Sequence, residues 1–156
     1  MPLEPVVETE AERRRWLSVL AKAPAKEVLA AWEGVAPPAY SPLRAPEIGM
    51  VLVRGRAGGT GDAFNLGEMT VTRAAVRLAS GETGVGYVAG RDRKHAEIAA
   101  AVDAMMQSAA LRPSVEGPVV ERLAAAQAAR REAAARKAAA TKVDFFTMVR
   151  TRGPAR

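Results

Sequence analysis

The apolar positions near the start of the chain recur at the spacing of an α-helix. Trp16 and Leu20 lie about one turn apart on the same stripe, and Pro24 ends the run. Thr9, followed three residues later by Glu12, has the pattern of a capping box. We therefore expect an amphipathic helix between these two signals.

A second, shorter stripe follows and stops near Gly34. With the first helix it predicts a helical hairpin, which the two tryptophans of the chain anchor to the core. The stripe consists of Val28, Leu29, Trp32 and Val35.

After this hairpin the period changes from helical to β-type. Prolines at positions 37, 38, 42 and 46 predict an extended connector over residues 36–46. The β-branched and apolar run 48–53 predicts a short strand, which a glycine cluster at 58–61 breaks. Two further strands are predicted over residues 66–79 and 85–89.

The apolar positions of the second predicted strand change phase partway along it. Met69 and Val71 are apolar at first, whereas the alternate set from Ala74 to Leu78 is apolar afterwards. A phase change in a period-2 pattern requires a β-bulge or a switch to helix. A short helix over residues 72–79 is therefore the alternative to a bulged strand.

The clearest helical pattern covers residues 91–111, and Pro113 closes it. A break at 114–118 separates it from a second helix, residues 119–141, which is rich in alanine, arginine, glutamate and lysine. That segment has high helix propensity but almost nothing to bury, so it predicts a projecting arm. The apolar face of the first helix consists of His95, Ile98, Val102, Met105, Met106 and Ala109.

Together these elements predict an α+β fold. It has a small antiparallel sheet, an N-terminal helical hairpin, a packing helix, and a C-terminal helical arm with an extended tail. We expect a core domain over residues 1–118, an arm over 119–141 and a partner-docking tail over 142–156. The chain of 156 residues is long enough for one such core.

Composition excludes several kinds of chemistry. The chain has no cysteine, which excludes disulfides, iron–sulfur clusters and thiol nucleophiles, and its one histidine is His95. Asp92 with His95 supplies at most half a metal site, and no nucleophile–base pair can be assembled. We therefore predict no catalytic residue, no metal site and no resident cofactor in this chain. No apolar run approaches the roughly 20 residues that span a bilayer, so we expect a cytoplasmic protein with no membrane partner.

The net charge of +6 belongs entirely to the second half of the chain. Residues 1–90 carry ten basic and ten acidic side chains, whereas residues 91–156 carry thirteen basic and seven acidic ones. The second half therefore faces something anionic: phosphate groups, nucleic acid or an acidic protein.

Two segments are candidates for binding an anion. The glycines at 58–61 allow backbone N–H groups to form an anion-binding nest, with a flexible hairpin loop as the alternative. Residues 91–97 place three cations at the positive end of a helix dipole, which a bound anion would offset; a solvated basic turn, with His95 at the rim of the core, is the alternative. The predicted anion-binding or partner-binding residues are Gly58, Gly59, Thr60, Gly61, Arg73, Arg91, Lys94 and His95.

The tail is apolar, although the helix that carries it has no apolar stripe. Exposed apolar patches mark interfaces, so docking on a partner is favoured over folding back onto the sheet. The predicted docking residues are Val143, Asp144, Phe145, Phe146, Met148 and Arg150.

Five segments, which together span nearly the whole chain, carry a resemblance to a known family. They are residues 14–21 (RRWLSVLA), 58–78 (GGTGDAFNLGEMTVTRAAVRL), 90–97 (GRDRKHAE), 103–107 (DAMMQ) and 143–150 (VDFFTMVR). In this order they resemble the PhnG family of the bacterial carbon–phosphorus lyase system. The chain departs from the family's pattern at the connector 36–46, at residues 112–141 and at Thr151.

The resemblance implies a function that composition does not. Members of the family are subunits of a phosphonate-activating transferase, alpha-D-ribose 1-methylphosphonate 5-triphosphate synthase. That complex transfers an alkylphosphonate to the ribose C1 of ATP and releases adenine. The implied partners are the other core subunits: one nucleosidase-like, one H-type, and one radical-SAM subunit whose iron–sulfur cluster this cysteine-free chain cannot host. The chain itself would have an assembly or co-catalytic role, with ATP as a substrate of the complex.

A nucleic-acid-binding protein is the alternative from a different class. It would lay the arginine-rich arm along a phosphate backbone. That hypothesis depends on charge alone, because RNA-binding aromatics and a recognition helix are absent, and we do not expect nucleic acid as a partner.

Overall fold

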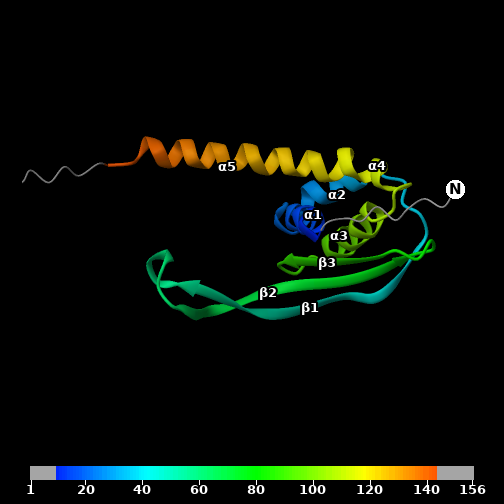
Figure 1. Cartoon of the computed structure of the whole chain (residues 1–156), viewed down its shortest axis with the longest axis horizontal. Coiled ribbons are helices and arrows are strands. Elements are labelled where there is room, and N and C mark those ends of the chain that lie inside the picture. Colours follow the sequence, from blue (N-terminus) through cyan, green and yellow to red (C-terminus); the bar gives the residue numbers. More distant parts are fainter. Residues whose placement is uncertain (1–9, 144–156) are drawn as a thin grey trace, which may run out of the picture.

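A computed structural model describes residues 10–143 of the chain. It confirms the α+β class: helices cover one face of a three-stranded antiparallel sheet (Figure 1). The strands are β1 (Tyr40–Arg56), β2 (Ala63–Leu78) and β3 (Thr83–Ala89), and they lie in that order across the sheet.

Helix α3 (Arg93–Met106) lies at the centre of the core and packs across β2 and β3. Every residue from Ile98 to Met106 is buried. The packing is close enough to require glycine in β3, because a Cβ atom at Gly86 would lie 1.9 Å from the Ala96 carbonyl oxygen. Backbone therefore meets backbone here, which explains how a chain with few aromatic residues builds a dense core.

The two N-terminal helices form where the apolar stripes predict them. They are α1 (Glu10–Lys22) and α2 (Ala25–Trp32), and both lie against α3. Trp16 is fully buried, and Trp32 is partly buried against the same core. Thr9, the predicted cap of α1, lies outside the described residues.

The predicted connector at 36–46 is wrong over most of its length, because β1 begins at Tyr40. This strand lies at the edge of the sheet, where proline is tolerated if its missing N–H would have faced solvent. The pairing with β2 shifts register between Pro42 and Arg44 and again between Arg44 and Glu47. These irregularities accommodate the prolines without ending the strand.

Strand β2 is continuous, so the alternative of a helix over residues 72–79 is wrong. Its pairing with β3 shows no register shift, so no bulge beside β3 causes the change of phase. The apolar positions change phase instead where helix α3 begins to cover β2. Residues 63–69 are exposed, whereas alternate residues from Thr72 to Leu78 are buried beneath α3.

The predicted α3 boundary at Leu111 and the predicted break at 114–118 are also wrong. Helix α3 ends at Met106, and Ala109, predicted on its apolar face, is exposed beyond that end. The short helix α4 (Arg112–Val115), the π-helical turn η2 (Glu116–Glu121) and helix α5 (Arg122–Ala140) then follow without interruption. Pro118 cannot donate a helical hydrogen bond and crowds the preceding turn, and the wider π turn accommodates it.

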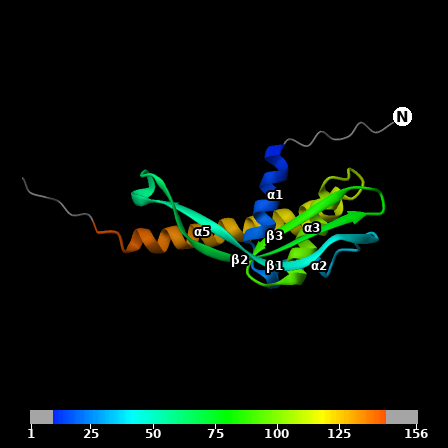
Figure 2. The same cartoon turned by 90° about the horizontal axis from the view of Figure 1, so that it is seen from below.

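Two elements project from the core in the same direction (Figures 1 and 2). One is α5, which is buried at its base through Leu123 and exposed from Ala128 to Ala140. The other is the part of the β1–β2 hairpin that extends beyond α3, residues 48–70, which we call the hairpin arm. Only the helical projection was expected from the sequence.

Candidate functional site

The predicted glycine cluster lies at the tip of the hairpin arm. Gly58 and Gly59 have positive φ values of 59° and 81° in the turn η1 (Ala57–Gly59), a conformation that favours glycine. The N–H of Gly61 donates to the Ala57 carbonyl oxygen at 2.9 Å. The cluster therefore reverses the direction of the chain. Anion binding by this cluster, to which Thr60 also belongs, stays a prediction.

Arg73 lies on the opposite face of the sheet from α3. Its Nη2 donates to Glu47 Oε1 at 2.8 Å, and its buried Nε has no hydrogen-bond partner among the described residues. The guanidinium is therefore already engaged by one carboxylate and turned away from the helical layer.

The basic turn before α3 is capped by an acid that the sequence reasoning did not assign. The Asp92 carboxylate accepts the backbone N–H of His95 at 2.9 Å and so complements the positive end of the helix. Lys94 pairs with Glu97 at 3.3 Å, and Arg91 is exposed. The conflict between these cations and the helix dipole is therefore smaller than the sequence suggested.

The His95 side chain is 2% exposed and points into the core. Its Nε2 lies 2.8 Å from the Leu20 carbonyl oxygen, one of the last four carbonyls of α1, which have no partner within that helix. In the tautomer that carries a proton on Nε2, the ring donates to this carbonyl and joins α3 to the end of α1. This position supports the rim-of-the-core alternative, and ligand contact by His95 stays a prediction.

The predicted anion-binding residues are not brought together. The N–H of Gly90, beside the basic turn, donates to the Thr70 carbonyl oxygen at 2.9 Å. From Thr70 the hairpin arm runs about 24 Å to Ala63, near the glycine tip. Arg73 lies on the other face of the sheet. The structure therefore offers no single pocket built from this set.

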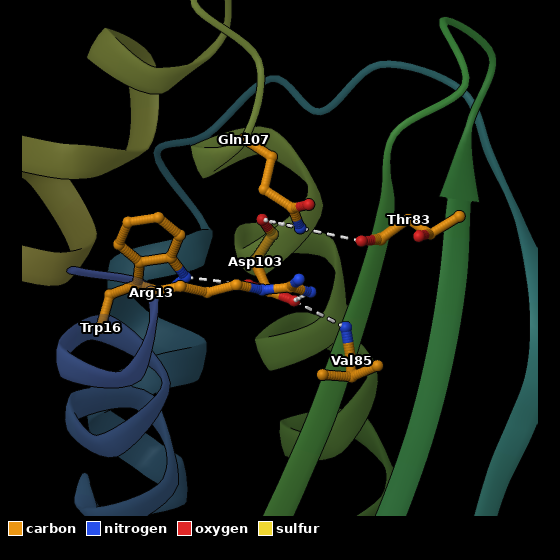
Figure 3. Close-up of polar contacts among 6 residues, drawn as sticks. All are labelled: Arg13, Trp16, Thr83, Val85, Asp103 and Gln107. Carbon is orange, nitrogen blue, oxygen red and sulfur yellow. Dashed lines mark hydrogen bonds and ion pairs between the residues drawn. The ribbon is translucent and has the colours of Figure 1, made fainter. Parts of the chain in front are cut away.

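The most heavily bonded polar group among the described residues is Asp103, which the sequence reasoning assigned no role (Figure 3). Its carboxylate is fully buried on α3 and accepts four hydrogen bonds. Arg13 donates two, at 3.2 and 2.8 Å, and Trp16 Nε1 and the Val85 backbone N–H donate at 2.9 and 2.8 Å. One carboxylate thus joins α1, α3 and β3.

Asp103 also protects the open edge of the sheet. It occupies the N–H of Val85 on the edge strand β3, and Gln107 Nε2 donates to the Thr83 carbonyl oxygen at 2.8 Å (Figure 3). Unpaired edge groups are templates for pairing with other chains. With both oxygens engaged, we assign Asp103 a structural role. A charged residue amid the apolar run of α3 was the available signal.

Tyr40 and Glu97 join β1 to α3. The Tyr40 hydroxyl donates to Glu97 Oε1 at 2.8 Å. Burial, and then the hydrogen bond and charge of this carboxylate, raise the pKa of Tyr40 from 10.0 to about 12. The protonated phenol therefore stabilises the fold fully below pH 10, and this contribution is lost as the pH rises towards 12.

Replacing Tyr40 with phenylalanine should flatten the fall in unfolding free energy between pH 10 and 12. The substitution should also remove the tyrosinate absorbance step near pH 12. Chemical denaturation at several pH values, together with an ultraviolet titration, checks both results. Tyr87→Phe removes the other tyrosine and is the control; equal flattening in both variants would contradict the assignment to Tyr40.

The hairpin arm carries an unusual surface of exposed apolar side chains. Thr70 lies two positions before Thr72, which is buried beneath α3, so both residues point to the α3 side of the sheet. Cross-strand neighbours share a face, so Met50, which is paired with Thr70, lies on this side as well. Val51 pairs with Met69 on the other side. The exposed set is Ile48 (41%), Met50 (67%), Leu52 (62%), Phe64 (45%), Leu66 (65%) and Met69 (43%).

This surface is apolar on both faces of the hairpin arm. Alternation places Ile48 and Leu52 on the side of Met50. A Cβ atom at Gly55 would lie 3.6 Å from the Phe64 ring and 3.8 Å from Leu66, so these two residues lie on the side of Met69. An isolated two-stranded hairpin is marginally stable in water, and apolar patches of this kind mark interfaces. The sequence motif around Phe64 and Leu66 was noted, but its exposure was not foreseen.

The predicted tail-docking surface cannot be compared in the same way. Val143 is exposed, and Asp144, Phe145, Phe146, Met148 and Arg150 lie outside the described residues. Docking through the tail stays a prediction.

Residues 10–143 contain no group of three or more histidine, cysteine, aspartate or glutamate side chains placed to hold a metal ion. None of the helices in this range is long and apolar enough to cross a membrane.

Comparison with known proteins gives the family. Residues 11–151 match the family described as phosphonate metabolism protein PhnG. The chain is also 50% identical, over 141 residues, to the alpha-D-ribose 1-methylphosphonate 5-triphosphate synthase subunit PhnG of Rhizobium meliloti (strain 1021). That match covers 90% of each chain. By both comparisons, this chain belongs to the PhnG family of phosphonate metabolism proteins.

Proposed function

We propose that this chain is an assembly subunit of alpha-D-ribose 1-methylphosphonate 5-triphosphate synthase and contributes no catalytic group of its own. The relative from Rhizobium meliloti is named as a subunit of that synthase. The observation that carries the assembly role is the hairpin arm, with three large exposed apolar side chains on each face. Exposed apolar surfaces of this kind mark sites where another protein binds, and here we infer another subunit of the synthase.

The two-sided character of the hairpin arm suggests how it docks. A flat partner surface would cover one face and leave the other in water. Insertion between elements of a partner would cover both faces and bury apolar area at about 25 cal/mol per Å². The proposed partners are the nucleosidase-like, H-type and radical-SAM subunits of the complex, acting on ATP in the cytoplasm.

The polar groups of the described chain support a noncatalytic role. The His95 ring donates to the Leu20 carbonyl oxygen within the core, and the oxygens of Asp103 are occupied by four donors. Both side chains are buried, at 2% and 0% exposure, so neither is open to a substrate from solvent. The nucleic-acid alternative depends on charge alone, and two arginines of α5, Arg130 and Arg136, are already paired with carboxylates.

The purified full-length chain should release no adenine from ATP and methylphosphonate, whereas the remaining subunits should regain activity when the chain is added back. Adenine release measured by chromatography checks this, and a tagged chain should retain the other subunits during purification. Turnover by the isolated chain above that of its His95→Ala variant would contradict the noncatalytic role. Full activity of the other subunits without the chain would contradict the proposal as a whole.

A further inference from the structure

A cleft with a volume of about 750 Å³ lies between α1 and α5. This volume is within the range of small-molecule sites. Its α5 side is formed largely by alanines, namely Ala124, Ala125 and Ala128, and its α1 side includes Ser18 and Val19. Neither the hairpin arm nor the Asp103 contacts form part of it.

The cleft has a physical cause in the sequence of α5. Gln127 Nε2 donates to the Val19 carbonyl oxygen at 2.6 Å, and Arg15 pairs with Glu121 at 2.7 Å. These contacts hold the two helices together, but alanine side chains are too short to fill the space between them. A helix selected only for packing would place larger apolar residues there.

Cations from both helices surround this alanine floor. They are Arg15 and Lys22 from α1 and Arg130 and Arg131 from α5, against one lining carboxylate, Glu121. Arg15 pairs with Glu121, and Arg130 binds Glu27 through both carboxylate oxygens, at 2.7 and 2.9 Å.

Lys22 and Arg131 have no ion-pair partner between residues 10 and 143. Both are exposed at the cleft. The lining therefore combines small alanine side chains with the Ser18 hydroxyl and two cations, one from each helix. Such a lining is suited to an elongated polyanion. Arginine binds phosphate oxygens in pairs, and lysine acts as a compact charge.

We propose that this cleft binds a triphosphate chain, carried either by a nucleotide or by a ribose phosphonate. The choice of triphosphate over other anions depends on the proposed function, because the product in the relative's name is a 5-triphosphate. The cleft would hold the phosphates of the substrate or product while the reacting sugar carbon lies against another subunit.

Isothermal titration of the full-length chain tests the proposal with three probes: ATP, tripolyphosphate and adenosine. ATP and tripolyphosphate should bind, with affinity falling as salt is raised, and adenosine should not bind. Equal affinity for the first two would assign recognition to the phosphates alone, whereas tighter binding of ATP would add a contact to the nucleoside. Absence of binding by both phosphate probes would overturn the proposal.

The double variant Lys22→Gln with Arg131→Gln should weaken both affinities at least about tenfold. Arg136→Gln with Lys137→Gln removes the same charge from the exposed end of α5, outside the cleft, and should have little effect. Equal losses in the two variants would show a general effect of charge and would overturn the site. All four positions are exposed, and melting temperatures verify that both variants are folded.

This test fails separately from the proposed function. A chain that assembles with the other subunits but binds no triphosphate would overturn the cleft alone. A chain that binds triphosphate but does not assemble would leave the cleft standing and contradict the assembly role.

Discussion

Replacing Asp103 with alanine should lower the free energy of unfolding by about 2–4 kcal/mol, because buried N–H donors lose their acceptor and the partly exposed Arg13 loses a carboxylate partner. The substitution leaves the Trp16 indole N–H and the Val85 backbone N–H without their acceptor and removes the Asp103 carboxylate from the Arg13 guanidinium. Urea denaturation followed by circular dichroism measures the loss. The substitution should also destabilise the edge strand β3, because the Asp103 carboxylate accepts a hydrogen bond from the Val85 backbone N–H of that strand.

Asp62→Ala is the matched control for this experiment. Asp62 lies near the glycine tip of the hairpin arm, far from α3, and its loss should change the unfolding free energy by no more than about 0.5 kcal/mol. Asp103→Asn should fall between the two, since the amide keeps one acceptor oxygen but removes the charge. If Asp103→Ala and Asp62→Ala melt together, the contacts of Asp103 contribute little to stability.

Replacing Met50, Leu52 and Leu66 together with glutamine should weaken binding to the other synthase subunits at least about 100-fold. The same variant should unfold at nearly the wild-type temperature, because all three side chains are mostly exposed in the isolated chain. The two readouts differ because the apolar area is buried only in the complex. Pull-down with the partner subunits and scanning calorimetry of the chain alone measure them separately.

Leu43→Gln provides the control for general loss of surface hydrophobicity. Leu43 is half exposed on the same strand but lies outside the hairpin arm. Its replacement should leave the pull-down unchanged. An unaltered pull-down for the triple variant, or a large fall in its melting temperature without partners, would contradict docking through the hairpin arm.

Local signals were sufficient to predict much of the fold. The apolar stripes of α1 and α2, the β-type run in β3 and the alanine-rich arm each have a period or propensity that neighbouring residues decide. The predicted element boundaries were wrong where the tertiary surroundings allow a residue that local rules would exclude from a strand or helix. The prolines of β1 are compatible with a strand because it lies at an edge, and Pro118 is compatible with a helical segment because a π turn receives it.

The candidate functional residues were harder to predict, since each depends on what lies across from it. The resemblance identified the family, but the anion-binding residues chosen by charge and glycine content lie on separate parts of the molecule. Gly86 was counted as an ordinary strand residue, although its contact with the Ala96 carbonyl oxygen allows α3 to approach β3. The role of Asp103 depends on Arg13 and Val85, which are distant from it in sequence and meet it only in the fold.

The sequence by itself determined the class of fold, the order of its elements and the family, because periodicity, capping and motif order are properties of consecutive residues. Only the tertiary structure decided which surfaces are covered. The same β2 strand is buried beneath α3 at one end and exposed on the hairpin arm at the other. The alanines of α5 predict a helix from their propensity alone, and they form one side of a cleft only where α1 lies against them. Burial and charge pairing depend on groups distant in sequence, so neither surface could be located before the helices and strands were placed together.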